Sequence, residues 1–217
     1  MPFKLSRISS RRALLTGAAM ALAAAPLLAA GPAMAADPAT TFVNDNIQKG
    51  LAILNNKALS PDQKRTQFEH LLLGLVDVRR IAVFTLGQYR RSTSPADVDA
   101  FVAAFRDYAV AAYQSYFAKY SSQTLKVTGS TQRAPTDYIV TTQMIDTKDS
   151  SGRPPLEVDF RVRTDTGKPV LVDVAVAGVW LSLEQRDQFT AFLGQNNGNI
   201  HALIGHLSEL ARNLNKS

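Results

Sequence analysis

Residues capable of catalytic chemistry are few in this chain, and they do not gather into a motif. The sequence holds three histidines and no cysteine. His201 and His206 lie five residues apart in a segment that predicts a helix, whereas metal ligands on one helix face lie three or four residues apart. There is no Gly-x-Ser-x-Gly turn, no glycine-rich phosphate loop and no His-Glu-x-x-His motif. We therefore predict no catalytic residue, no metal site and no enzyme activity.

One carboxylate stands out, because Asp173 lies among valines in the stretch 169–186, PVLVDVAVAGVWLSLEQR. A β-branched residue at every second position predicts a strand with one apolar face. An acid in a half-buried strand is usually paired with an arginine, and Arg161 or Arg163 is the expected partner. The valines of the predicted apolar face are Val170, Val172, Val174 and Val176.

The end of this stretch predicts a change of direction. Gly178 interrupts the alternation, which indicates a bulge or a bend, and Val179 resumes it. Ser182 and Gln185 then have the spacing of a capping box, in which each side chain bonds the other residue's backbone N–H. The central strand is therefore expected to continue past Gly178 and to run almost directly into a helix.

The first half of the chain has helical patterns. Capping residues followed by proline mark three helix starts, at Asp37-Pro38, Ser60-Pro61 and Ser94-Pro95. A shorter helix is predicted between Val76 and Tyr89. The helix that begins at Ser94-Pro95 is expected to extend to Tyr120, and its apolar stripe is rich in aromatic residues. That stripe includes Phe101, Phe105, Tyr108 and Tyr116.

Beyond residue 121 the apolar period changes to two. Strands are predicted at Leu125–Gln132, Tyr138–Asp146 and Leu156–Thr164, and the short turns between them suit antiparallel hairpins. In the third strand one face is apolar and the other is charged, so one face of the sheet is expected to be wet. We predict an α+β fold in which a four-stranded antiparallel sheet is packed on one face by N-terminal and C-terminal helices. The expected layout is helices over 38–120, the sheet over 123–181 and C-terminal helices over 183–215.

The first 35 residues have the pattern of an export signal. Basic residues precede an apolar run over 13–30, and Ala33-Met34-Ala35 fits the small-x-small cleavage rule. A retained membrane anchor is the alternative, but the run is rich in alanine and ends at Gly31-Pro32. We predict cleavage after Ala35 and a mature domain of 36–217. Arg11-Arg12 leaves export by the twin-arginine route open beside the ordinary route.

The charge of the chain is concentrated in that segment. The formal net charge is +6, but the first 35 residues carry four basic residues and no acidic one. The rest of the chain holds 20 basic against 18 acidic residues. Without a basic stripe interleaved with aromatic residues, no nucleic-acid partner is predicted.

Three groups of residues, taken with their order and spacing, carry a family resemblance over about 39–210. They are Asp77-Val78-Arg79-Arg80-Ile81-Ala82 with Leu86-Gly87-Gln88-Tyr89-Arg90, Phe101-Val102-x-x-Phe105-Arg106-x-Tyr108 with Tyr113, and Val172-Asp173-Val174 with Gly178-Val179 and Gln185-Arg186-x-x-Phe189. In these groups the chain resembles the toluene-tolerance family, also called the MlaC family. Trp180 departs from the pattern, because a small residue is expected there in many relatives.

The resemblance implies a periplasmic carrier. Its expected sheet is of the nuclear-transport-factor-two type, and its expected cargo is a phospholipid whose tails lie inside the protein, with no cofactor. Its implied partners are an outer-membrane lipoprotein complex and an inner-membrane ABC transporter with a substrate-binding ring, each contacted transiently. Three alternatives stay open: a carrier of hopanoids or other polycyclic lipids, a periplasmic bridging protein that binds no lipid, and an enzyme acting on lipid.

Apolar side chains of the predicted strands and helices are the expected lipid-binding residues. The same side chains could interlock as an ordinary core, and the resemblance is what favours a cavity. Arg79, Arg90 and Arg91 are candidates for headgroup contacts, against the alternative of solvated surface arginines. The lipid-binding candidates are Phe84, Phe101, Phe105, Tyr108, Tyr116, Val140, Val158, Phe160, Val162, Val172, Val174, Val176 and Val179.

Overall fold

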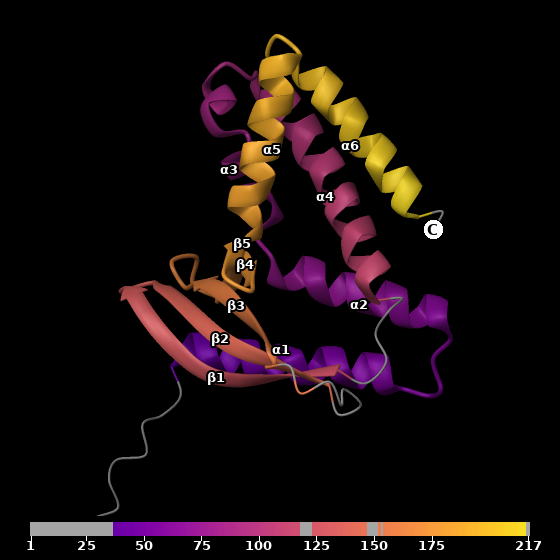
Figure 1. Ribbon diagram of the computed structural model, residues 1–217, viewed down its shortest axis with the longest axis vertical. Helices are drawn as coiled ribbons and strands as arrows, with labels where there is room; N and C mark the ends of the chain where they lie inside the picture. The colour runs from indigo at the N-terminus through magenta and orange to yellow at the C-terminus, as the bar shows by residue number, and fades with distance from the viewer. Residues whose placement is uncertain (1–36, 118–122, 147–151, 153, 216–217) are drawn as a thin grey trace, which may run out of the picture. The chain divides into compact units, whose positions relative to one another are not determined.

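Helices come first in the folded chain, then a meander of strands, then two more helices (Figure 1). The computed structural model describes residues 37–117, 123–146, 152 and 154–215, apart from the side chains of 115–117. The predicted export signal and the predicted end of the long helix at Tyr120 lie outside these residues. The elements are α1 (Pro38–Asn55), α2 (Pro61–Leu75), α3 (Val78–Thr85), the 3-10 helix η1 (Gly87–Arg91), α4 (Pro95–Phe117), β1 (Gln123–Ala134), β2 (Asp137–Asp146), β3 (Leu156–Arg163), β4 (Val170–Val176), β5 (Val179–Trp180), α5 (Leu181–Gln195) and α6 (Ile200–Leu214).

The predicted helix starts are confirmed, because each is made by local capping chemistry. The Asp37 carboxylate accepts hydrogen bonds from the N–H groups of the first turn of α1. Ser60 and Gln63 form the reciprocal capping box at the start of α2. The Ser94 hydroxyl accepts a hydrogen bond of 3.1 Å from the Asp97 N–H at the start of α4.

The sheet is antiparallel and its strands follow chain order, but it has five strands and not the predicted four. The difference arises at Ala177 and Gly178, whose φ angles are +50° and +80°. Two successive residues with positive φ make the two-residue turn that best fits the twist of a hairpin. The chain therefore folds back after Val176, and Val179 pairs with it in β5.

A bulge in β4 changes which side chains share a face. Phe160 pairs with Val174 and Arg161 pairs with Asp173, but Val162 pairs with Leu171. Val172 is therefore an extra residue in β4, and the alternation reverses on its two sides. The prediction that all four valines of this strand share one face is wrong, because Leu171 joins Val174 on the apolar face.

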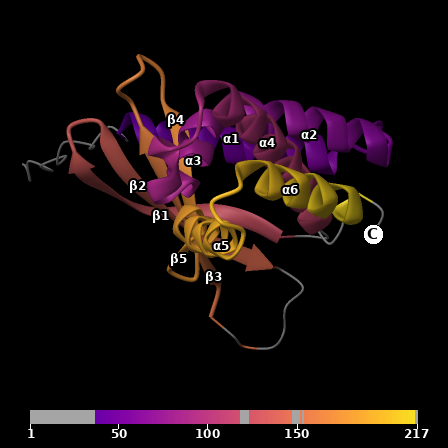
Figure 2. The same cartoon turned by 90° about the horizontal axis from the view of Figure 1, so that it is seen from above.

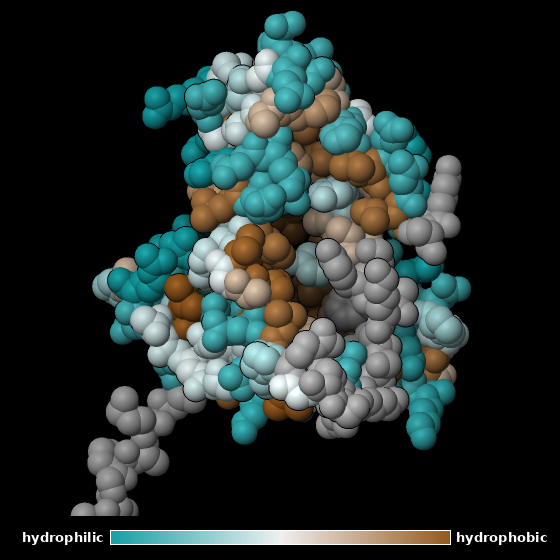
Figure 3. Space-filling view, in the orientation of Figure 1, coloured by the Kyte–Doolittle hydropathy of each residue, from teal (hydrophilic) through white to brown (hydrophobic). Residues whose placement is uncertain are grey.

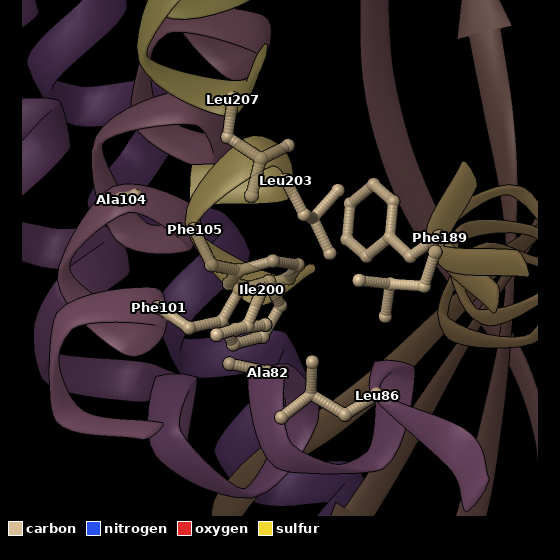
Figure 4. Packing of buried hydrophobic residues seen from close by; sticks show 10 residues of the cluster. Ala82, Leu86, Phe101, Ala104, Phe105, Phe189, Ile200, Leu203 and Leu207 are labelled. Carbon is tan, nitrogen blue, oxygen red and sulfur yellow. The ribbon is translucent and has the colours of Figure 1, made fainter. Parts of the chain in front are cut away.

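The helices do not jointly cover one face of the sheet as predicted. Helix α1 packs on the apolar face, where its Ala39 and Val43 form a buried core with strand residues. Helices α3, α4, α5 and α6 pack on one another and form a second core (Figures 1, 2 and 4). The strand residues of the first core are Tyr138, Val140, Val162 and Leu171. Ala36–Ser217 thus forms one compact unit with two hydrophobic clusters.

Candidate functional site

The buried residues form two separate hydrophobic clusters, one beneath α1 and one among the helices α3 to α6. The space-filling view shows the surface hollowed between the sheet and the helices α4 and α5, with hydrophobic residues around the opening (Figure 3). The candidate site is this hollow.

The apolar sheet face supplies side chains that neither cluster buries. β3 is an inner strand, and β4 pairs with β5 at Ala175 and Val176, next to the half-buried cross-strand pair of Phe160 and Val174. Val176 is also half-buried, although its cross-strand partner Val158 is buried. Further along the same face Leu156 is 41% exposed. This end of the face therefore presents apolar surface that no helix covers completely.

The rest of the apolar face is close-packed. Val140 and Val162 have no exposed surface and lie in the core beneath α1. Thr142 is also fully buried on this face, and its hydroxyl donates a hydrogen bond of 2.8 Å to the Val158 carbonyl. Since a buried polar group needs a partner, this bond allows a threonine among the valines. The predicted lipid-binding residues of the sheet thus divide into a packed group and a half-buried group.

Two of the predicted lipid-binding aromatics lie in the helical core. Phe101 is fully buried and Phe105 is 6% exposed. Their rings meet the Phe189 ring edge to face, with centroids 6.1 and 6.3 Å apart (Figure 4). This geometry is typical of an aromatic core cluster. The structure therefore separates these two residues from the half-buried sheet residues.

The other predicted residues are distributed over several places. Tyr108 is half-buried beside the helical core, and its hydroxyl accepts a bond of 3.5 Å from the Gln185 side chain. Phe84 and Val179 are 43% and 52% exposed, so they lie at the surface. Val172 lies in the bulge and lines a groove on the polar side of the sheet. The side chain of Tyr116 lies outside the described residues.

Two of the three arginines proposed for headgroup contacts line one surface cavity of 760 Å³, beside α3 and η1. Arg79 pairs with Asp99 at 2.6 Å, and both side chains are more than half exposed. Arg90 also lines this cavity, together with Arg80. Arg91 is exposed and is not among the lining residues. The cavity is distinct from the half-buried end of the apolar face, since the two share no residue.

Charged side chains on the polar sheet face form a chain of ion pairs that the sequence did not predict. Asp137 accepts two hydrogen bonds from Arg161, at 3.0 and 2.7 Å. Arg163 lies 3.7 Å from the same carboxylate and donates to Asp165 at 2.7 Å. Arg80 on α3 reaches Asp165 as well. The network therefore ties α3 to the sheet.

The electrostatics of this network follow from its geometry. The hydrogen bonds from Arg161, opposed by burial, hold the pKa of the Asp137 carboxyl below its ordinary value. The same contact raises the pKa of the Arg161 guanidinium. A forked guanidinium facing a carboxylate is the strongest geometry for such a pair. The sequence does not predict this pair, because Asp137 and Arg161 lie 24 residues apart.

Asp173 has a different partner from the one predicted. Its side chain is 8% exposed and accepts hydrogen bonds from the Ser182 N–H and hydroxyl and from the Val174 N–H. Arg161 lies opposite it in the sheet but bonds Asp137. The expected Ser182 capping box is also wrong, because α5 begins at Leu181 and the Ser182 hydroxyl donates to Asp173.

Metal-ligating side chains do not cluster in the described part of the chain. Within it, no group of three or more histidine, aspartate or glutamate side chains could hold a metal ion. None of its helices has both the length and the apolar character needed to cross a membrane. What the geometry does provide is a hollow with partly uncovered apolar walls.

Comparison with known proteins identifies the family. The model of the family described as MlaC protein matches residues 44–209. The chain belongs to the MlaC family. A phospholipid-binding protein from Ralstonia solanacearum, solved in complex with a phospholipid, has a similar fold with a TM-score of 0.70. The two chains are 21% identical over 81% of this chain and 98% of the other.

Membership of the MlaC family confirms the resemblance found in the sequence. The α+β fold with its antiparallel sheet is shared with the Ralstonia protein. The MlaC family is one of periplasmic binding and transport proteins and is not a known enzyme family.

Proposed function

We propose that this chain is a periplasmic carrier that holds the acyl chains of a phospholipid in the hollow between its two cores. The observation that carries the proposal is the half-buried end of the apolar sheet face, at Phe160, Val174 and Val176, in the middle of an otherwise packed domain. Membership of the MlaC family and the phospholipid held by the Ralstonia protein support the same function.

Burial of the acyl chains supplies the affinity. Two chains of about 16 carbons each gain roughly 25 kcal/mol gross when buried, at ~0.8 kcal/mol per methylene. A ligand held by this much apolar burial leaves very slowly into water. Release therefore requires a partner that receives the lipid. The proposed partners are an outer-membrane lipoprotein complex and an inner-membrane ABC transporter with a substrate-binding ring.

The residues that hold the lipid are proposed in two groups. Phe160, Val174 and Val176 contact the acyl chains, since their side chains are half-buried on the apolar face and Phe160 also packs at the edge of the sheet core. Arg79 and Arg90 contribute positive charge at a surface cavity. In this arrangement the tails lie inside and the phosphate headgroup remains near the surface, where arginines can bind its oxygens. Phe101 and Phe105 stabilise the helical core and have no direct role.

The experiment is organic extraction of the purified protein followed by mass spectrometry. The expected result is phospholipid with two acyl chains, close to one molecule for each protein chain. A polycyclic terpenoid in its place would assign the chain to hopanoid transport. Protein that carries no lipid, and takes none from mixed vesicles, would contradict the proposal and leave a bridging role.

A further inference from the structure

A second surface of this chain carries aromatic and arginine side chains around a groove on the polar sheet face. The groove has a volume of 270 Å³ and lies between α3, the sheet and the start of α5. Its lining residues are Arg80, Ile81, Phe84, Arg133, Arg161, Arg163, Val172, Asp173, Trp180, Ser182 and Leu183. We call this surface the arginine groove. It does not include the half-buried end of the apolar face, which the proposed function uses.

The positive charge of the groove exceeds its negative charge. Four arginines line it, and Asp173 is the one acidic residue among the lining. Asp173 already accepts hydrogen bonds from Ser182 and from its own strand. Arg80, Arg161 and Arg163 form ion pairs with Asp137 or Asp165. Arg133 has no ion pair among the described residues. Arg133 is therefore the guanidinium that remains for an incoming anion.

Two exposed apolar side chains, Phe84 and Leu183, line the groove. Among the described residues five large hydrophobic side chains are exposed, and four of them lie on α3 or in the segment 179–183. They are Phe84, Val179, Leu181 and Leu183, and Leu156 is the fifth. Arg186 lies over the Phe84 ring, 5.4 Å from its centre. Aromatic and arginine side chains beside exposed leucines form the composition enriched in protein interfaces.

The arrangement favours a protein segment over a membrane surface. Arg161 and Arg163 are held in place by carboxylates, so they present fixed N–H groups inside a recess. Fixed guanidinium groups bind carboxylate and phosphate oxygens alike in a forked geometry, so their place in the recess is what favours a protein side chain. Attraction to an anionic membrane comes instead from cations that reach the headgroup layer. A recess of this volume admits side chains of a partner.

We propose that the arginine groove binds a segment of a partner protein in which carboxylate side chains alternate with large apolar ones. Carboxylates contact Arg133 and the exposed N–H groups of its neighbours. Apolar side chains pack on Trp180, Phe84 and Leu183. The inference does not rest on lipid binding, because none of Phe160, Val174 and Val176 lines the groove.

The probe is a labelled peptide that alternates glutamate with leucine, titrated with the purified mature chain and followed by fluorescence anisotropy. Replacing its glutamates by lysine, or its leucines by serine, is expected to weaken binding at least about tenfold. Raising the salt concentration weakens binding as well, because the contacts are partly between charges. Vesicles containing phosphatidylglycerol are the second probe.

Two pairs of matched variants locate the contact. Arg133→Glu and Leu183→Ser alter the groove, whereas Arg212→Glu on α6 and Leu156→Ser on β3 make the same changes elsewhere. Leu183 and Leu156 are 39% and 41% exposed, so the second pair is matched in exposure. The groove variants are expected to weaken peptide binding about tenfold or more, while the control variants change it by less than about twofold. Circular dichroism melts check that all four variants fold.

Three results would overturn the proposal. The first is no binding of the acidic peptide by the parent chain. The second is binding that Arg133→Glu and Leu183→Ser leave unchanged while both variants fold. The third is vesicle binding that the groove variants abolish, without peptide binding, which would assign the groove to a membrane surface.

Discussion

The carboxylate of Asp173 accepts hydrogen bonds from both the backbone N–H and the hydroxyl of Ser182, so that β4 is joined to the first turn of α5. The N-cap residue of α5 is Trp180, whose side chain makes no capping hydrogen bond. A carboxylate at a helix N-terminus satisfies N–H groups and interacts favourably with the helix dipole. Asp173 thus caps α5 from a neighbouring strand.

Removing this cap should destabilise the fold. Asp173→Ala leaves the Ser182 N–H and hydroxyl buried without their acceptor, which costs about 1–3 kcal/mol. Urea denaturation of the lipid-free protein measures the change in the free energy of unfolding. Asp187→Ala is the control, because Asp187 is 71% exposed and pairs only with its neighbour Arg186. Equal stability of the two variants would contradict the role given to Asp173.

Substitution by tryptophan distinguishes a residue that faces the hollow from a residue in the packed core. Val174→Trp is expected to lower the amount of bound lipid while changing the melting temperature of the lipid-free protein little, because the new ring occupies space meant for acyl chains. Val140→Trp is the matched change at a position with no exposed surface on the same sheet face. There the ring has no space, and overpacking costs about 1–3 kcal/mol or more. The comparison is made without lipid, since bound ligand itself raises stability.

Thermal melts and lipid extraction on the two variants complete this test. If Val174→Trp unfolds the lipid-free protein as Val140→Trp does, the apolar face is ordinary core along its whole length. The alternation of the sequence places Asp173 on the opposite face from Val174, but Asp173→Trp is not a neutral control. Asp173 is buried and bonded, so its replacement damages the fold directly.

The Asp137 ion pair should make stability depend on pH. The folded-state pKa of Asp137 lies below the unfolded value of about 3.9. The contact therefore stabilises the fold above that pH and is lost as the pH falls through the folded pKa. Asp137→Asn is expected to cost about 1–3 kcal/mol near pH 7, and the gap from the parent should narrow below about pH 4.

Urea denaturation over a pH series measures that gap. Asp62→Asn is the control, since Asp62 pairs with Arg65 on the surface of α2 and is 81% exposed. Exposed pairs contribute about 0–1 kcal/mol, so its gap should be small at every pH. A constant gap for Asp137→Asn from neutral to acid pH would show that the variant acts through packing and not through charge.

Two glycines should respond in opposite directions to the same substitution. An added Cβ meets nothing within 4 Å at either Gly178 or Gly205. Gly178 has a φ of +80°, which costs an L-residue roughly 1–2 kcal/mol, so Gly178→Ala should destabilise the fold by about that amount. Gly205 lies within α6 on its exposed side, where alanine is favoured by about 1 kcal/mol. A stabilising Gly178→Ala would contradict the two-residue turn.

Cell fractionation and the intact mass of the protein test the predicted export signal. Protein produced with its full sequence should fractionate with the periplasm, and its intact mass should correspond to a chain that begins at Ala36. Arg11→Lys with Arg12→Lys distinguishes the two routes, because it blocks the twin-arginine route and leaves the ordinary one working. Recovery of membrane-bound protein that retains Met1 would contradict cleavage.

The sequence predicts elements well where their causes are local. Ser60 and Gln63 bond each other across three residues, and that spacing is visible in the sequence. The period of two in β3 likewise predicts a strand whatever its neighbours are. The fifth strand was missed because an alanine, Ala177, adopts a positive φ, which alanine rarely does.

The candidate site is less predictable, because its causes are not local. The bulge at Val172 depends on how β4 pairs with β3, and a shift of one residue moves every following side chain to the other face. Phe101 and Val174 are equally apolar in the sequence, yet one lies in a packed core and the other is half-buried. An apolar residue faces the hollow or the core according to how the two cores are placed in the fold. The pattern of apolar residues in the sequence does not show that placement.

The division into two cores has a mechanical consequence. Helix α3 is attached to β4 through the pairing of Val76 with Leu171, and α5 continues directly from β5. A small rotation at these two junctions changes the width of the hollow while each core keeps its own packing, as in hinge motion between rigid bodies. If the hollow holds acyl chains as proposed, lipid extracted from the purified protein should therefore contain chains of different length and unsaturation.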